Sequence, residues 1–154
     1  MSDGVAIHGG CLCKAITYTI LPLTQREIEN GDPNLVGPGG RISGNHCHCD
    51  TCRNICGGLF QTLAQVTNGR MKITDSKGSL THYQTPNALR GFCNICGTTL
   101  WIKDEPETGY INVSVGGMDK VEAKKWIHIR HHIFLGDTVD GGVWEFRDDL
   151  PKQV

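Results

Sequence analysis

The stretch CHCDTC, residues 47–52, places Cys47, Cys49 and Cys52 within six positions, with His48 between the first two. Cysteine sulfur is a preferred ligand of zinc in tetrahedral protein sites, and two thiols from one tight turn span one edge of the tetrahedron. The stretch is therefore either half of a closed structural metal site or a nearly complete reactive one. The other cysteines of the chain bear on the choice.

Two further cysteine pairs stand apart from this stretch. Cys93 and Cys96 form a C-x-x-C pair followed by Gly97, which is typical of a metal knuckle because glycine permits the positive-φ turn. Cys11 and Cys13 follow two glycines at positions 9 and 10. If the N-terminal segment lies beside the second knuckle, these two pairs complete a structural site with four cysteine ligands.

Removing those four cysteines leaves Cys47, Cys49 and Cys52, with Cys56 four residues beyond. Three thiolates on one loop can hold a zinc ion and leave its fourth position to water or substrate, which is the general pattern of catalytic zinc. Alternatively Cys56, His46 or His48 closes the tetrahedron and the site is inert. Spacing alone leaves both interpretations open.

Length and charge limit the other possibilities. The 154 residues fit one domain, 1–154, and a net charge of −1 from 15 basic and 16 acidic residues offers no basic stripe for nucleic acid or membrane. The N-terminus lacks a signal-like pattern, and no segment approaches the roughly 18 apolar residues of a membrane span. We expect a cytoplasmic protein whose eight cysteines stay reduced and serve metal binding or catalysis.

Short apolar runs between turn signals, with 20 glycines, predict a mainly β domain. Residues 21–45 contain three prolines and five glycines, which indicates a surface excursion with one possible helical turn at 24–29. The best helix candidate is 121–126. The strands are expected at 15–20, 59–66, 70–74, 80–85, 98–103 and 110–115.

Three motifs, in order, carry a family resemblance: GGCLCKAITY (9–18), CHCDTCRNICGGLF (47–60) and LRGFCNICGTTLW (89–101). They resemble the glutathione-dependent formaldehyde-activating enzymes and their relatives in the centromere protein V group. A looser likeness continues in HHIFLGD (131–137), the tryptophan at 144 and DDLP (148–151). Cys56 and the long 21–45 segment depart from the usual pattern of that family.

The resemblance implies stacked antiparallel sheets in a tent-like arrangement, with zinc knuckles, few short helices and two zinc ions. It also implies carbon–sulfur bond formation or cleavage, such as joining glutathione to formaldehyde. Carried over by motif, the structural set is Cys11, Cys13, Cys93 and Cys96. The set at the reactive metal, with the catalytic role, is Cys47, Cys49 and Cys52.

Zinc suits thiol chemistry because it binds a thiol as thiolate and does not oxidise the sulfur. Our hypothesis is that a substrate thiolate takes the fourth position on the reactive metal. Arg53 is a candidate for binding a glutathione carboxylate, although a solvated charge explains it as well. Strand alternation in WIHIRHHIF (126–134) would place His128, Arg130 and His132 on one face, lining a cleft or facing solvent.

Three functions follow from these observations. The first is a zinc-dependent carbon–sulfur lyase or synthase acting on a glutathione or small thiol adduct. The second is an enzyme on the same scaffold that takes another small molecule of specialised metabolism, with residues 21–45 reshaping the pocket. The third is a non-catalytic, zinc-stabilised binding module, for which no basic extension is present. The sequence leaves the oligomeric state open.

Overall fold

The computed structural model describes residues 6–139, 151 and 153, and within them the protein is mostly β. Three short α-helices are present in this part of the chain: α1 (Gln25–Asn30), α2 (Asp50–Cys56) and α3 (Lys120–Trp126). The strands are β1 (Ile7–Gly10), β2 (Ile16–Ile20), β3 (Val36–Gly37), β4 (Arg41–Cys47), β5 (Gln61–Thr67), β6 (Met71–Asp75), β7 (Leu80–Thr85), β8 (Ala88–Cys93), β9 (Thr99–Asp104), β10 (Tyr110–Ser114) and β11 (Ile127–Ile133).

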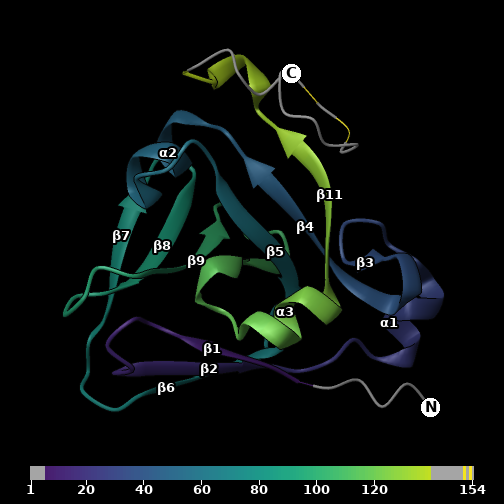
Figure 1. Cartoon of the computed structure of the whole chain (residues 1–154), viewed down its shortest axis with the longest axis horizontal. Coiled ribbons are helices and arrows are strands. Elements are labelled where there is room, and N and C mark those ends of the chain that lie inside the picture. Colours follow the sequence, from purple (N-terminus) through teal and green to yellow (C-terminus); the bar gives the residue numbers. More distant parts are fainter. Residues whose placement is uncertain (1–5, 140–150, 152, 154) are drawn as a thin grey trace.

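The strands form two sheets. A small sheet has the order β1-β2-β6, and a large one has the order β11-β4-β5-β10-β9-β8-β7, with β3 paired to β4. The pairs are antiparallel except that β11 runs parallel to β4. In Figure 1 the small sheet lies at the base, and strands of the large sheet rise from either end toward α2, which confirms the tent-like arrangement of sheets.

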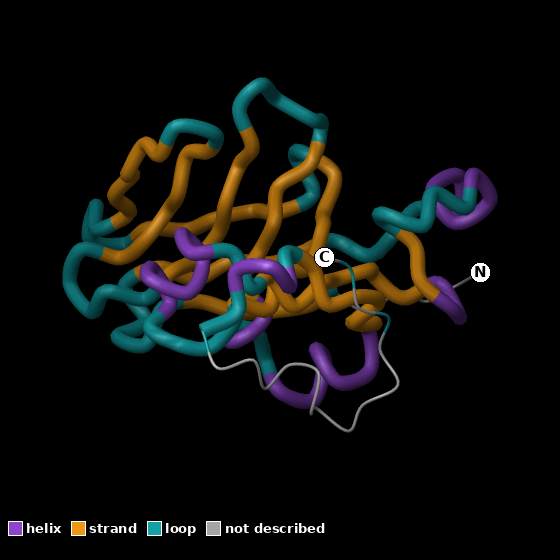
Figure 2. Tube along the Cα trace, turned by 90° about the horizontal axis from the view of Figure 1, so that it is seen from above, coloured by secondary structure: helices purple, strands orange, loops and turns teal. Residues whose placement is uncertain are grey.

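The helices are peripheral to this framework. Seen from above, the strands make up the body of the molecule, and the helices are short coils around it (Figure 2). Helix α1 begins at a capping box in which Thr24 and Glu27 satisfy each other's backbone N–H groups, and it ends at Gly31 with φ 63°. In the described residues no helix is long and apolar enough to span a membrane.

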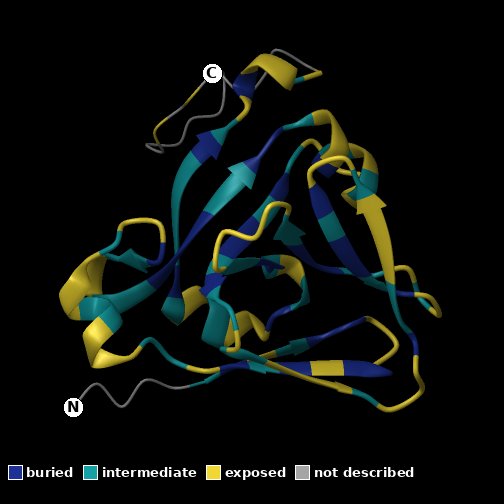
Figure 3. Ribbon diagram, turned by 180° about the vertical axis from the view of Figure 1, so that it is seen from behind, coloured by how far each residue is buried: buried dark blue, intermediate teal, exposed yellow. Residues whose placement is uncertain are grey.

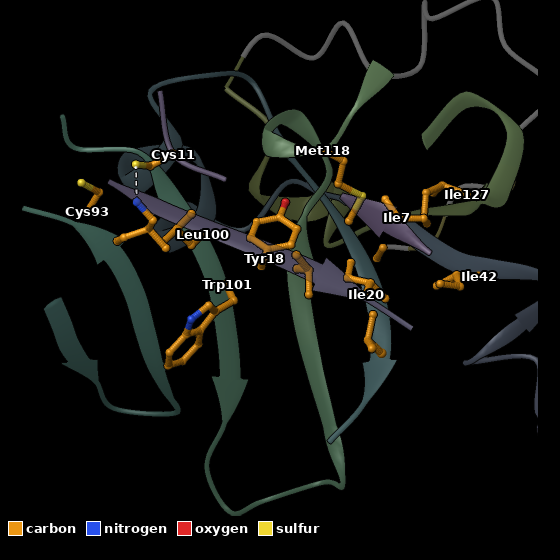
Figure 4. Packing of buried hydrophobic residues seen from close by; sticks show 14 of the residues in the cluster. Ile7, Cys11, Tyr18, Ile20, Ile42, Cys93, Leu100, Trp101, Met118 and Ile127 are labelled. Carbon is orange, nitrogen blue, oxygen red and sulfur yellow. Dashed lines mark hydrogen bonds between the residues drawn. The ribbon is translucent and has the colours of Figure 1, made fainter. Parts of the chain in front are cut away.

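The main core lies between the small sheet and the large one. Its buried members include Ile7, Ile16 and Ile20 from the small sheet and Leu100 and Val113 from the large one, and burying each large aliphatic side chain contributes about 2 kcal/mol. Figure 4 shows that Cys11 and Cys93 lie at one end of this cluster, near Leu100. The first cysteine pair therefore reaches the second through the packing of the two sheets.

Burial follows the strands that carry this core. In Figure 3 the buried colour runs along the inner strands, whereas loops, α1 and the edge strand β7 are largely exposed. Ser43 on β4 is 2% exposed and donates from its hydroxyl to the carbonyl of Pro33 at 3.0 Å. This bond satisfies a polar group in an otherwise buried strand.

The possible helical turn at 24–29 is confirmed as α1, and residues 21–40 are mostly exposed or half-buried, but the expectation of a surface excursion was wrong for residues 41–45. The segment holds α1 and β3, and from Arg41 onward it belongs to β4, an inner strand of the large sheet. The stretch RISGN lacks the apolar alternation of a typical strand because Ser43 is buried through its hydrogen bond and Gly44 faces a backbone. A Cβ at Gly44 would lie 2.7 Å from the carbonyl oxygen of Leu63 on β5.

Candidate functional site

Four thiols meet where the turn between β1 and β2 lies beside the turn between β8 and β9. The sulfur atoms all lie within 4.8 Å of one another; Cys11 Sγ is 3.5 Å from Cys13 Sγ, which is 3.8 Å from Cys93 Sγ. We call this set the four-thiol cluster: Cys11, Cys13, Cys93 and Cys96. The geometry brings together the two cysteine pairs that the spacing suggested as partners.

Local backbone geometry shapes both halves of the four-thiol cluster. Gly97 has φ 73°, and its N–H donates to the carbonyl of Cys93 at 2.8 Å, which folds the second knuckle. Thr98 Oγ1 lies 3.2 Å from Cys96 Sγ and accepts from the N–H of Leu12 at 3.0 Å, so it links the two turns. Hydrogen bonds from the side chain of Thr98 and then from the backbone of Thr98 and Cys13 lower the pKa of the Cys96 thiol to about 5.

Three other thiols gather at the end of β4 and the start of α2, near the apex in Figure 1. We call this set the three-thiol site: Cys47, Cys49 and Cys52. Cys49 is the N-cap of α2, and its sulfur accepts from the N–H of Cys52 at 3.4 Å. Because Cys47 ends a strand and Cys52 lies in the first turn of the helix that follows, one tight connection brings all three sulfurs together.

The three-thiol site opens into a cavity of about 490 Å³ on one face of the large sheet. All three cysteines line it, together with side chains from β4, β5, β8, β9 and β10. The polar side chains that come from these strands are Asn45, Gln65, Arg90, Asp104 and Asn112. A cavity of this size, with few polar groups converging on reactive sulfur, has the form of a small-molecule site.

The three thiols differ in acidity. The hydrogen bond from the Cys47 thiol, opposed by burial, lowers the pKa of Cys52 to about 6, and Cys49 and the Arg90 guanidinium act in the same direction. The same hydrogen bond, with burial, raises the pKa of Cys47. Of the three thiols, Cys52 is therefore the one whose surroundings most favour the thiolate form.

The candidates for a fourth ligand lie elsewhere. Cys56 is exposed, and its sulfur accepts from the N–H of Gly58 at 3.3 Å instead of joining the three-thiol site. His46 Nδ1 lies 2.9 Å from Thr62 Oγ1, and His48 Nε2 lies 2.9 Å from Nδ1 of His132. Among the described histidine, cysteine and acidic residues, none adds a fourth ligand atom to the group of three.

Arg53 lies on α2 but is not among the described residues that line the cavity. Its guanidinium bonds to the Asp50 carboxylate, and Nε donates to the carbonyl of His48 at 3.2 Å. These contacts connect the first turn of α2 to His48, which lies between Cys47 and Cys49 of the three-thiol site. Its role as a carboxylate binder stays a prediction.

Strand β11 departs from the alternation expected of it. Its register with β4 shifts between Ile129 and His131, so His128 pairs with Ser43 whereas His132 pairs with His46. Because Ser43 and His46 are three residues apart on a regular strand, His128 and His132 lie on opposite faces. His132 is 1% exposed and lies 2.9 Å from His48, so the expectation of one shared polar face was wrong.

Arg90 is one of the cavity residues that the sequence pattern did not single out. It stands in ALRGFC, a short strand that leads directly into the second knuckle. A charged residue flanked by apolar ones in a buried strand is a usable signal, because such a charge requires a partner.

Of the tryptophans, Trp101 is buried in the core, and Trp144 lies outside the described residues, as do residues 148–150.

Comparisons with known proteins agree with this geometry. The family model for "Glutathione-dependent formaldehyde-activating enzyme" matches residues 36–137, more than half of the chain. The match contains the three-thiol site and the second knuckle, and it begins after Cys11 and Cys13. The structure, not the match, joins the first cysteine pair to the rest.

One curated relative, an "uncharacterized lyase" of Schizosaccharomyces pombe, is 31% identical over 94 residues, which are 61% of this chain and 55% of the relative. The match thus spans about half the length of that protein. The crystal structure of a Rhodobacter sphaeroides protein is similar with a TM-score of 0.54 at 19% identity, over 77% of this chain and 93% of that one. At this identity the likeness shows the fold alone.

Proposed function

The chain belongs to the glutathione-dependent formaldehyde-activating enzyme family, and we propose that it is a metal-dependent carbon–sulfur lyase or synthase acting on a small thiol adduct. Glutathione adducts of the S-hydroxymethyl type are the first candidates. One observation carries the proposal: three thiols converge on the wall of a 490 Å³ cavity, and no described residue offers a fourth ligand atom.

We propose zinc for both cysteine groups. The donor sets fit, because four sulfurs within 4.8 Å match a closed tetrahedral site and three sulfurs match a site with one exchangeable position. The four-thiol cluster would then be structural, since it joins two sheets, and the three-thiol site reactive, since it faces the cavity. When bound there, zinc would hold a substrate sulfur as a nucleophilic thiolate without redox chemistry.

The residues of the cavity would bind and orient the rest of the substrate. Asn45 lines the cavity, and its Oδ1 is buried with no hydrogen-bond partner within the described residues, so its amide has unused hydrogen-bonding capacity. Asn112 donates to Asp104 at 3.2 Å, which fixes its amide at the floor of the cavity. These amides suit the hydroxyl or carbonyl groups of an adduct whose sulfur lies beside Cys52.

The substrate partner is proposed to be a small molecule, with neither nucleic acid nor membrane as a ligand, and the location to be the cytoplasm. The near-neutral net charge supports the first point. The second is supported by the cysteines, because all eight are free thiols, as a reducing compartment would keep them.

A substrate other than glutathione is the second candidate, and one observation favours it. Of the two acidic residues among those lining the cavity, Asp104 and Asp137, neither would attract the carboxylates of glutathione, and the cation Arg90 faces a thiol. A thiol adduct that carries an amine and lacks carboxylates would suit this lining better.

The test measures exchange between ¹³C-formaldehyde and its thiol adduct by NMR, with glutathione and with cysteamine as thiols. We expect the protein to accelerate exchange for at least one thiol, Cys52→Ser to abolish the acceleration, and Cys56→Ser to keep it. If neither thiol exchanges faster than in buffer although metal is bound at both cysteine groups, the proposed activity on these thiol adducts is wrong.

A further inference from the structure

Arg90 is a buried arginine whose guanidinium faces a thiol instead of a carboxylate. It lies on β8, is 6% exposed and lines the cavity. Its two terminal nitrogens donate to the sulfur of Cys52 at 3.8 and 3.9 Å, which are hydrogen-bond distances for sulfur. Both arms of the guanidinium fork are therefore directed at one atom of the three-thiol site.

No acidic side chain in the described part of the chain forms an ion pair with Arg90. Its Nε, also buried, has no hydrogen-bond partner there. A guanidinium keeps its charge at any physiological pH, and a buried charge without a counterion strongly destabilises a fold. The sulfur of Cys52 is thus the group that balances Arg90.

Charge counting shows what this contact does for a metal held by the three thiols. Three thiolates around a divalent ion carry one net negative charge, and a fourth ligand that is itself a thiolate raises that to two. Arg90 supplies one permanent positive charge next to Cys52. With Arg90 in place, the site without substrate is neutral overall, and binding a thiolate leaves a single negative charge.

Building on the proposed function, we propose that Arg90 is a positioning residue that makes the three-thiol site selective for an anionic sulfur ligand. It acts through Cys52 and need not touch the substrate. A neutral ligand such as imidazole does not change the charge of the site, so its affinity depends little on Arg90. For a unit charge about 6 Å away, at an effective dielectric of about 20, thiolate affinity should depend on Arg90 by about tenfold to hundredfold.

The experiment uses the full chain with cobalt in both cysteine groups and follows the sulfur-to-cobalt charge-transfer and ligand-field bands. Wild type, Arg90→Gln, Arg90→Lys and the control Arg41→Gln are each titrated with 2-mercaptoethanol and with imidazole. Arg41 is a suitable control because it is an arginine of intermediate burial whose guanidinium contacts His128, not a cysteine. Circular dichroism checks the fold of every variant.

We expect Arg90→Gln to weaken 2-mercaptoethanol binding about tenfold to hundredfold and imidazole binding less than about threefold. Arg90→Lys should restore part of the thiol affinity, and Arg41→Gln should change neither. If Arg90→Gln weakens the binding of both ligands equally, or changes the binding of neither, the inference is wrong. The proposed function is unaffected by that result as long as the wild-type protein binds the thiol. If Arg90→Gln does not fold, Arg90→Met, which keeps much of the apolar length of the side chain without its charge, is titrated instead, and the same outcomes support or overturn the inference.

The proposed function has its own readout in the same titration. If cobalt-loaded wild type binds imidazole but no thiol, the site is open and does not take substrate sulfur, so the proposed function fails together with the inference. If it binds 2-mercaptoethanol and Arg90→Gln binds it equally well, only the role of Arg90 is wrong.

Discussion

The backbone of Gly91 on β8 lies directly against the indole ring of Trp101 on β9. A Cβ at position 91 would lie 2.3 Å from Cε2 and 2.6 Å from Nε1 of that buried ring. Any side chain at this position must therefore displace a large aromatic group from the main core.

Gly91→Ala should destabilise the fold by about 1–3 kcal/mol, since an overpacked core forces a side chain out of its rotamer. Tryptophan fluorescence during urea unfolding measures the change. Gly116→Ala is the matched control, because a Cβ there meets no atom within 4 Å. Equal stability of the Gly91→Ala protein would mean that Trp101 is not packed as described.

On the proposed assignment of one metal ion to each cysteine group, Cys52→Ser should remove one ion and leave the fold in place, because the main core does not depend on the three-thiol site. Cys56→Ser, which replaces an exposed thiol outside the site, should retain both ions. Metal content by mass spectrometry of the native protein checks both variants. Complete unfolding of Cys52→Ser would show that this metal is structural.

Cys96→Ser should cost more stability than Cys49→Ser. Cys96 belongs to the four-thiol cluster, which we propose to be a structural metal site between the two sheets, and loss of a structural metal removes folding free energy directly. We expect a cost of about 3 kcal/mol or more, which lowers Tm by about 6–12 °C in a chain of this length. Calorimetry on metal-loaded proteins compares the two, and equal Tm values would contradict the division into structural and reactive groups.

Arg41→Met should raise the pKa of His128. Burial and then the Arg41 guanidinium lower that pKa below the usual range, and Arg41 donates to Nδ1 at 3.3 Å, which requires a neutral ring. The NMR titration of the imidazole should therefore move to higher pH. His131, whose pKa is lowered by burial and Arg130, should stay unchanged as the internal reference.

The same shift fixes the sign of a pH effect on stability. Because the folded-state pKa of His128 lies below that of the unfolded chain, its contribution is fully present above about pH 6.5 and is lost as the pH falls. Arg41→Met should therefore flatten the acid side of the stability profile. A steeper acid side in the variant would contradict the assignment.

Much of the fold was readable from alternation and turn signals. The expected strand at 80–85 coincides with β7, and those at 70–74, 98–103 and 110–115 differ from β6, β9 and β10 by one residue. Strands β1, β4 and β8 were missed because glycine, buried serine and arginine replace the apolar alternation there. Contacts with residues distant in the sequence stabilise these strands, and the local alternation of apolar and polar residues does not report such contacts.

For the candidate site, spacing grouped the cysteines as the structure does, because ligands of one metal must come from tight turns. The cavity was not predictable in the same way. Asn45, Gln65, Arg90 and Asn112 come from four strands and meet only through the order of the large sheet. The register shift in β11 also has no sequence signature, and it separates His128 from His132.

The two cysteine groups differ in how far apart their members lie along the chain. The three-thiol site is complete within residues 47–52, whereas the four-thiol cluster joins Cys13 to Cys93, 80 residues later. A nascent chain on the ribosome can therefore present all three thiols of the first group long before the second can close, which must wait for the β8–β9 hairpin. The four-thiol cluster can therefore form only late in synthesis. The three-thiol site is available to a metal ion as soon as residues 47–52 have left the ribosome.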